Sequence, residues 1–283
     1  MKQKITKEFK SAHRIKGAVR DKTSLMKLRK KILSFYAKEG RDLPWRNTNN
    51  PYHILVSEFM LQQTQAGRVR EYYERFISKL PDLQSLARVK TPVLLKLWSG
   101  LGYNSRALRL RTAAQELLRI YDGKFPQEEK LLQKLPGIGE YTSAAILAFA
   151  FNKPVPVVDI NIRRVLLHEL GLDNSVSNDE LRVIAKQLIP RGKSALWHNA
   201  LMDYGASLSA GVKKLYPPLT KQSSFKGSRR EARGYILKTL LKEKTAEKKS
   251  LLSGIQHPEK EDILAQLEEE NFLTVKNGIV RLK

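Results

Sequence analysis

The sequence predicts an all-α fold that ends in a small domain of helices and a β-hairpin, and three observations support this prediction. Apolar residues recur at helical spacing in several segments, for example over residues 25–38. Proline and glycine break one helical segment at Leu135–Gly139, and another helical segment begins at once. Near the C-terminus, Asn277-Gly278 separates two short β-prone segments, which is a strong hairpin signal.

The charge of the chain favours a nucleic acid as its partner. The 283 residues include 52 Lys+Arg against 28 Asp+Glu, which gives a formal net charge of +24. A field of this sign attracts polyanions and speeds encounter with them, and the charge exceeds what solubility alone needs.

The length suits about two domains, and a hydrophobic content of 41% is ordinary for a globular core.

Several classes of protein are excluded by what the sequence lacks. It has no apolar run of about 18 residues and no apolar segment after its N-terminus, so we expect neither a membrane span nor a secretory signal. Its cysteine count is zero, which excludes disulfides and any thiolate-held zinc or iron–sulfur site. We expect a cytoplasmic protein, associated with the nucleoid if bacterial, and no metal site, because the histidines are scattered: His13, His53, His168, His198 and His257.

The first two segments of the chain differ in character. Residues 1–22 are rich in Lys and Arg and lack helical periodicity, and we interpret them as a mobile basic arm that can touch phosphates. The alternative is a transit peptide. The apolar stripe of residues 25–38 stops at Gly40 and predicts a helix.

A glutamate on an apolar helix face is the first candidate for chemistry. Asn50 and Pro51 mark a helix start, because Asn is a preferred N-cap and Pro suits the first helical position. Ile54, Glu58 and Leu61 then share one face of that helix. An apolar wall raises the pKa of a glutamate, which can then keep its proton near neutral pH and act as a general acid. The alternative is a structural glutamate paired with an arginine.

A glycine-rich loop precedes the next predicted helix. Two glycines flank Leu101 within Trp98–Asn104, which predicts a tight loop with exposed apolar and aromatic tips. The alternative is an ordinary connector between helices. The amphipathic helix that follows is predicted over Ser105–Tyr121 and ends at Asp122-Gly123.

The turn at Leu135–Gly139 lies between a short helix predicted over Gln127–Lys134 and a second helix over Glu140–Phe151. This order is a helix–hairpin–helix pattern. Its glycines let a phosphate approach backbone N–H groups at a helix N-terminus, so it predicts sequence-independent binding to a DNA strand.

Asp159 precedes a helix predicted over Ile160–Leu170 and ended by Gly171. Asp is a preferred N-cap, and this structural role alone accounts for its position. A carboxylate there is also held ionised and fixed in direction, so it can stabilise a developing positive sugar. Cleavage of a base from its sugar needs a protonated carboxyl at the base and an anion at the sugar, and Glu58 and Asp159 suit these needs with opposite pKa shifts.

Residues from about Leu43 to Asp203 resemble the helix–hairpin–helix glycine/proline/aspartate superfamily of DNA glycosylases, and within it the MutY-type adenine glycosylases. Six motifs agree with that family in order and spacing. They are L-P-W-R (Leu43–Arg46), P-Y-H-I-L-V-S-E-F-M-L-Q-Q-T (Pro51–Thr64), W-S-G-L-G-Y (Trp98–Tyr103), L-P-G-I-G-E-Y-T (Leu135–Thr142), D-I-N-I-R-R-V (Asp159–Val165) and A-L-M-D-Y-G-A (Ala200–Ala206).

The resemblance implies a catalytic role for three residues. Glu58 would protonate the departing adenine, and Asp159 would stabilise the oxocarbenium ion or its covalent successor. Tyr141 stands where endonuclease III-type relatives have a Schiff-base lysine, which implies base removal without strand cleavage. The base would be flipped out of the stack to reach these groups.

The resemblance also implies contacts with DNA. Tyr103 would be the wedge that pushes into the stack, Gln62 and Thr64 would lie near the base opposite the target, and the hairpin glycines would hold a phosphate. A monovalent ion on the hairpin carbonyls is compatible with the family. The residues assigned to DNA binding are Gln62, Gln63, Thr64, Leu101, Tyr103, Gly137, Gly139 and Tyr141.

The chain departs from the family at its iron–sulfur site. When the family pattern is laid on the sequence without gaps, its four cysteines fall on residues of other types, so we expect no such cofactor. We interpret residues 215–225 as an apolar, proline-stiffened replacement loop. The four positions are Ser209, Tyr216, Leu219 and Phe225.

Three further departures concern the DNA contacts. Ile160 follows the aspartate where the family usually has Gly, and Asn104 follows Tyr103 where the family often has a second tyrosine. The family's C-terminal domain, which reads 8-oxoguanine, does not fit into residues 226–283. These residues combine helical periodicity with a hairpin and predict a winged-helix-like domain, either an extra DNA-contacting module or a small packing domain.

Together these features predict a bilobal core over residues 23–225 and the winged-helix-like domain over 226–283. One lobe is six helices over about 46–155, the other joins 23–45 to 156–225, and the DNA cleft would lie between them. The favoured function is excision of adenine opposite 8-oxoguanine or guanine in double-stranded DNA, by a monomer that does not bind membranes. The alternatives are a thymine or uracil glycosylase acting on mispairs with guanine, and a non-catalytic lesion-binding protein.

Overall fold

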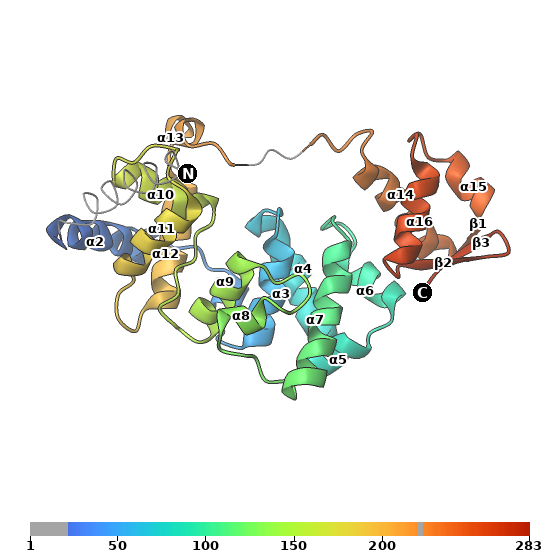
Figure 1. The fold of residues 1–283 in the computed structure, drawn as a ribbon, viewed down its shortest axis with the longest axis horizontal. Coiled ribbons are helices and arrows are strands. Elements are labelled where there is room, and N and C mark those ends of the chain that lie inside the picture. The colour runs from blue at the N-terminus through green and yellow to red at the C-terminus, as the bar shows by residue number, and fades with distance from the viewer. Residues whose placement is uncertain (1–21, 220–222) are drawn as a thin grey trace, which may run out of the picture. The chain divides into compact units, whose positions relative to one another are not determined.

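Helices form most of the regular structure in the computed structural model, which describes residues 22–219 and 223–283 (Figure 1). Residues 1–21 of the predicted basic arm lie outside the described residues. The described chain divides into two compact units. The first comprises residues 22–54, 127–133 and 138–219, and the second comprises residues 55–126, 134–137 and 223–283. The predicted lobe bounds remain a prediction.

The regular elements of the first unit are all helices within its described residues. Its core is built around α12, which packs against α2, α9 and α10 and buries Trp197, Ala200 and Leu201 completely. The elements are α2 (Lys22–Glu39), the 3-10 helix η1 (Pro44–Arg46), α8 (Glu129–Leu132), α9 (Glu140–Ala150), α10 (Ile160–Glu169), α11 (Asn178–Leu188), α12 (Ser194–Ser207) and α13 (Ala210–Leu215).

Ion pairs tie the L-P-W-R segment to α12. Arg46 donates from Nη1 and Nη2 to the two carboxylate oxygens of Asp203, at 2.7 and 2.8 Å. Arg41 adds bonds to the same carboxylate from its backbone N and its Nε. Burial by itself would raise the pKa of Asp203, but the bonds from Arg46 and Arg41 lower it below its usual value. Two of the family-like motifs are therefore structural here.

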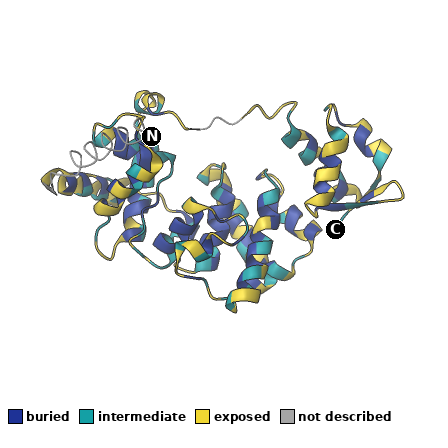
Figure 2. Cartoon of the chain, viewed as in Figure 1, coloured by how far each residue is buried: buried dark blue, intermediate teal, exposed yellow. Residues whose placement is uncertain are grey.

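Helix α3 (Pro51–Leu61) runs from the first unit into the second. Asn50 begins it as predicted, because its Oδ1 accepts a bond from Tyr52 N at 2.9 Å. Figure 2 shows α3 mostly buried. The second unit continues with α4 (Ala66–Lys79), α5 (Leu83–Arg88), α6 (Thr91–Trp98) and α7 (Ser105–Tyr121), and α7 has the predicted bounds.

The C-terminal part of the second unit has the predicted winged-helix-like character. Its three strands form one antiparallel sheet in the order β1-β3-β2. Asn277 and Gly278 both have positive φ and make the tight turn between β2 and β3, as the sequence predicted. The elements are α14 (Arg229–Glu243), β1 (Thr245–Glu247), α15 (Lys248–Ser253), α16 (Lys260–Glu269), β2 (Leu273–Lys276) and β3 (Ile279–Leu282).

The apolar stripes predicted for this domain form its core. Ile236 of α14, Ile263 and Leu267 of α16 and the following Phe272 are all completely buried. Strand β1 was not predicted, because a strand of three residues is too short to carry a two-residue alternation. Within the described parts of the chain, no helix combines the length and the apolar character that crossing a bilayer requires.

Candidate active site

Glu58 lies in the most apolar part of α3. Glu58 is only 4% exposed, and its helix neighbours Leu55, Val56 and Phe59 are completely buried. The predicted placement of Glu58 on a buried face is therefore confirmed. Burial removes most of the water around a carboxyl, and loss of water by itself disfavours the ionised form.

Arg106 fixes the chain that follows Glu58. From α7 its guanidinium donates to the carbonyls of Phe59, Met60 and Gln62 and to Oγ1 of Thr64. These carbonyls belong to the C-terminal turn of α3 and the residues after it, where a helix leaves acceptors without intrahelical partners. Burial lowers the pKa of Arg106 to about 10. At neutral pH the side chain stays charged and serves as a C-terminal cap for α3.

Arg106 also holds the glycine-rich loop. It donates to the carbonyls of Leu101 and Gly102 at 3.2 and 3.0 Å. One buried cation thus joins the loop to the end of α3, and with it Gln62, Thr64 and Tyr103. Sequence reasoning missed Arg106, although a signal was present. It falls in the same helical stripe as Leu110, Ala113 and Leu117, all of which are completely buried.

The glycine-rich loop does not expose Leu101. Leu101 is buried, at 6% exposure, so the prediction of an exposed apolar tip is wrong for this residue. Gly100 and Gly102, both with positive φ, turn the backbone so that Leu101 points into the protein. Tyr103 is half-buried and has φ of 48°, a left-handed conformation that is costly for a residue with a Cβ. The contribution of Leu101 to DNA binding remains a prediction.

The hairpin turn has the backbone that its glycines predict. Gly137 has φ of +80°, and a Cβ on it would lie 2.8 Å from the ring of Phe59, the neighbour of Glu58. Only glycine fits this close approach. Gly139 is the N-cap of α9, and a Cβ there would meet nothing within 4 Å. The backbone at the start of α9 is therefore sterically open on that side, as a phosphate contact requires.

Asp159 is the N-cap of α10, as predicted. Its Oδ1 accepts a bond from Ile162 N at 2.7 Å, and its Oδ2 accepts one from Asn161 Nδ2 at 2.9 Å. The direction of the carboxylate is therefore fixed through both oxygens. The expectation of a lowered pKa is wrong: desolvation raises the pKa of Asp159, against the opposing effect of these bonds and of the nearby charge of Arg164.

His198 holds the segment that leads into Asp159. Its Nε2 accepts a bond from Val157 N at 3.1 Å, and its Nδ1 donates to the carbonyl of Ser194 at 2.8 Å. The bond accepted by Nε2 requires the neutral ring, and burial lowers the pKa of His198 to about 4. Gly205 lets α12 approach α10, because a Cβ on it would lie 2.5 Å from the carbonyl oxygen of Asn161. Sequence reasoning treated His198 only as a scattered histidine.

Tyr141 lies in the first turn of α9 and packs, half-buried, against a small apolar cluster that contains Ala144, Ala145 and Val157. It carries a phenol and no amine. The predicted residues are thus divided between the units: Glu58, Gln62, Gln63, Thr64, Leu101, Tyr103 and Gly137 belong to the second, and Gly139, Tyr141 and Asp159 to the first.

The four positions that the family pattern gives to cysteines do not suit an iron–sulfur cluster. Ser209 Oγ accepts a bond from Val212 N and begins α13, and Tyr216 is buried in the core of the first unit. Leu219 and Phe225 are 66% and 60% exposed. None of these side chains offers a thiolate ligand for such a cluster. Residues 220–222 of the predicted replacement loop lie outside the described residues.

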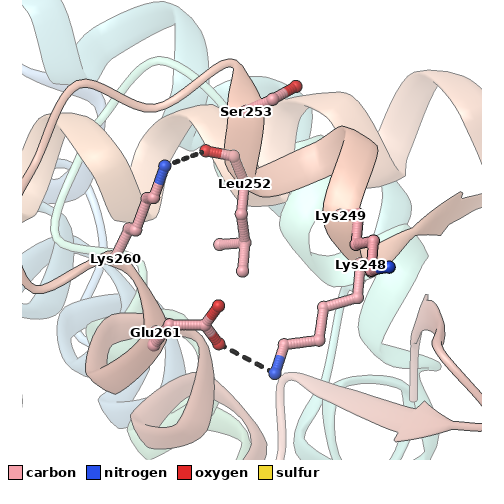
Figure 3. A pocket seen from close by; sticks show the side chains of 6 residues that line it. All are labelled: Lys248, Lys249, Leu252, Ser253, Lys260 and Glu261. Carbon is pink, nitrogen blue, oxygen red and sulfur yellow. Dashed lines mark hydrogen bonds and ion pairs between the residues drawn. The ribbon is translucent and has the colours of Figure 1, made fainter.

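A hollow in the C-terminal domain does not coincide with the predicted site. It measures about 390 Å³ and lies between α15 and α16 (Figure 3). Two of its lysines are engaged, because Lys248 pairs with Glu261 and Lys260 donates to the carbonyl of Leu252. In the described ranges, no group of three His, Asp or Glu side chains could hold a metal ion. The lining residues are Lys248, Lys249, Leu252, Ser253, Lys260 and Glu261.

Comparisons with known proteins place most of this chain in one family. Residues 56–191 match the family described as HhH-GPD superfamily base excision DNA repair protein. The adenine DNA glycosylase of Mycobacterium tuberculosis is 35% identical over 236 residues, which cover 74% of this chain and 77% of that protein. The adenine DNA glycosylase of Mus musculus is 36% identical over 229 residues, but the chain spans only 44% of its length.

A solved structure is also similar over most of its length. The structure of a thermostable thymine-DNA glycosylase is 30% identical, with a TM-score of 0.60, and the match covers 68% of this chain and 94% of that chain. The similar proteins are named for two different bases, adenine and thymine, so these names do not identify one target base.

Proposed function

Because the chain belongs to the HhH-GPD superfamily of base excision DNA repair proteins, we propose that it is a monofunctional DNA N-glycosylase that removes adenine mispaired with 8-oxoguanine or guanine. The observation that carries the proposal is the burial of Glu58 among the apolar residues of α3. The net charge of +24 supports double-stranded DNA as the partner.

Glu58 is the general acid of this proposal. Adenine is a poor leaving group, and protonation of a ring nitrogen weakens its bond to the sugar. A carboxyl that is excluded from water favours its protonated form and can present that proton to a flipped base. The framework that Arg106 builds around the end of α3 holds the acid in place.

Asp159 is the anion that stabilises the positive sugar. Its two oxygens are already oriented by Ile162 N and Asn161 Nδ2, so little reorganisation is needed as charge develops. Because burial raises its pKa, the carboxylate loses its charge at a higher pH than an exposed aspartate would. A cation next to it favours the ionised form, so the transition state itself strengthens this interaction.

The remaining residues supply DNA contacts and limit the chemistry. Gly137 and Gly139 would hold a phosphate at the start of α9, and Tyr103 would enter the base stack. Tyr141 supplies no amine for a Schiff base, so we expect an abasic site as the product and no strand cleavage. A monomeric, cytoplasmic enzyme without a cofactor remains our expectation.

Excision of thymine or uracil opposite guanine is the second candidate. The similarity to a thermostable thymine-DNA glycosylase, at 30% identity over 94% of that chain, supports it. Tyr141 and Asp159 suit either base. A buried acid such as Glu58 suits adenine better, because adenine offers ring nitrogens that need protonation before departure.

The test is single-turnover base release from a panel of duplexes. The duplexes contain adenine opposite 8-oxoguanine, adenine opposite guanine, thymine or uracil opposite guanine, and normal pairs only. Wild-type protein is compared with Glu58→Gln, Asp159→Asn and a matched control, Glu71→Gln, which changes an exposed glutamate on α4. We expect adenine release that the first two variants lose and the control keeps.

Other outcomes would redirect the proposal. Release of thymine or uracil without adenine would favour the second candidate. Tight binding to mispairs without release of any base would support a lesion-binding protein and contradict the enzyme. Strand cleavage, together with a covalent protein–DNA adduct after borohydride reduction of a Schiff base, would contradict the monofunctional mechanism.

A further inference from the structure

A side chain of the C-terminal domain contacts the residue proposed as the wedge. Arg230, in the first turn of α14, donates from Nη1 to the Tyr103 hydroxyl at 2.7 Å. Its guanidinium also lies 5.2 Å from the centre of the Tyr103 ring. The two residues are 127 positions apart in the chain and belong to the same compact unit. A charge-assisted hydrogen bond and a cation–π contact therefore act on one aromatic ring.

Arg230 is itself held by the residues before α14. Its Nη2 donates to the carbonyls of Ser223 and Ser224 at 2.6 and 3.3 Å, and its guanidinium lies 6.0 Å from the Phe225 ring centre. A planar guanidinium can make all of these contacts at once, whereas a lysine ammonium cannot. Arg230 therefore has little freedom to leave Tyr103.

The backbone of Tyr103 is fixed separately by the core. Arg106 and Trp98 Nε1 both donate to the carbonyl of Gly102, and the Arg106 guanidinium lies 5.6 Å from the Tyr103 ring centre. The core thus fixes the backbone next to Tyr103, and Arg230 fixes the position of the Tyr103 hydroxyl. Immobilising a side chain before binding reduces the entropy lost when DNA arrives.

The rest of the domain is poorly suited to reading DNA with α16. That helix corresponds to the one that helix-turn-helix proteins place in the major groove. Its exposed residues include the acidic Glu261, Asp262, Glu268 and Glu269, which phosphates would repel. The neighbouring arginines of α14 are engaged inside the domain: Arg229 pairs with Glu259, and Arg233 pairs with Glu270.

We propose that Arg230 is a positioning residue for base flipping, through which the C-terminal domain fixes Tyr103 in the orientation that enters the base stack. This inference rests on the proposed function, because it takes Tyr103 as the wedge. It gives the domain a role in excision that does not require it to read a DNA sequence.

The test compares three changes in the full chain. Arg230→Ala removes the contact with Tyr103, and Arg230→Lys keeps the positive charge but loses the planar guanidinium. Arg229→Ala is the matched control, because it breaks an ion pair of the same helix without touching Tyr103. Hydrogen exchange of the amides of residues 99–105 is measured without DNA. Unstacking is then measured by 2-aminopurine fluorescence beside an adenine opposite 8-oxoguanine, together with single-turnover base release.

We expect Arg230→Ala to speed exchange in the loop and to slow both unstacking and base release by about three- to tenfold. Arg230→Lys should recover part of the loss, and Arg229→Ala should change none of these quantities. In a Tyr103→Phe background, which removes the accepting hydroxyl, the loss on adding Arg230→Ala should be smaller than in the wild type.

Three results would overturn the inference. Arg230→Ala and Arg229→Ala could behave alike in every measurement, the effect of Arg230→Ala could be undiminished by Tyr103→Phe, or Arg230→Ala could speed unstacking, which would make the contact a brake. If the wild type unstacks the duplex but releases no base, and Arg230→Ala slows unstacking, the proposed function fails while the positioning role stands. If the wild type releases adenine and Arg230→Ala has no effect, only the inference fails.

Discussion

Glu58 and Asp159 are both carboxylates on helices, but their surroundings differ. Glu58 lies within α3 among completely buried apolar side chains, and the cation near that helix, Arg106, donates to main-chain carbonyls. Asp159 lies at the N-terminus of α10, where one backbone N–H and one side-chain amide hold its two oxygens. Glu58 is distinguished by its burial, and Asp159 by the two hydrogen bonds that orient its carboxylate.

The difference is consistent with the two roles that we propose for these carboxyl groups. Apolar enclosure favours a neutral acid, and directed hydrogen bonds favour an anion of fixed orientation. Burial nevertheless raises the pKa of Asp159, so the contrast lies in orientation as much as in charge. The predictions below test each side of this contrast.

The largest effect is expected at Glu58. Glu58→Gln keeps the size of the side chain but cannot donate a carboxylic proton, and the rate of adenine release should fall by about 10²–10⁴-fold. Affinity for a duplex that contains an abasic-site analogue should stay close to that of the wild type. Single-turnover kinetics and fluorescence anisotropy measure the two quantities. An unchanged rate would remove Glu58 from the mechanism.

A somewhat smaller effect is expected at Asp159. Asp159→Asn still offers an oxygen to Ile162 N, so the melting temperature should change little, but base release should slow by about 10²–10³-fold through loss of the negative charge. Asp159→Ala should also lose about 1 kcal/mol of stability with the N-cap. In the wild type, release should decline as the pH falls toward the raised pKa of this group. Equal rates of base release for Asp159→Asn and the wild type would leave Asp159 only its role as the N-cap of α10.

Arg106 should matter for stability before it matters for chemistry. Arg106→Met leaves buried carbonyls of α3 and of the loop without their donor, which should cost about 3–5 kcal/mol. Arg111→Met is the matched control on the same helix and should cost less, because among the described residues Arg111 donates to two acceptors, the Val89 carbonyl and Thr91 Oγ1. Thermal unfolding compares the two variants. A smaller loss for Arg106→Met than for Arg111→Met would contradict this role.

The smallest effect is expected for His198 and depends on pH. Its pKa is about 4 in the folded protein against 6.5 when unperturbed, so the unfolded chain binds the proton more tightly. The stabilisation is therefore complete above about pH 6.5 and is lost as the pH falls toward 4. At about 1.4 kcal/mol per pKa unit, the loss is about 3 kcal/mol.

His198→Gln should flatten this dependence. Glutamine does not titrate in this range, so the variant should lose less stability than the wild type between pH 6.5 and 4, even if it is less stable at pH 8. Urea denaturation at several pH values measures both curves. Parallel curves would show that another group causes the acid sensitivity.

Local patterns in the sequence determined the helices around the site and the ends that matter for it. Asn50 begins α3 and Asp159 begins α10, and in the hairpin Gly137 has the positive φ and Gly139 the open surroundings expected of them. The same holds for the Asn277-Gly278 turn. These features depend on residues a few positions apart, so the order of residue types is enough to predict them.

Tertiary structure alone decided which distant groups support those elements. Arg106 joins α3 to the loop of Tyr103, His198 holds the chain before Asp159, and Arg230 reaches Tyr103 from the C-terminal domain. The burial of Leu101 and the raised pKa of Asp159 also depend on segments far away in the chain. Desolvation and long-range hydrogen bonds arise only when such segments pack together, and no local spacing of residues encodes them.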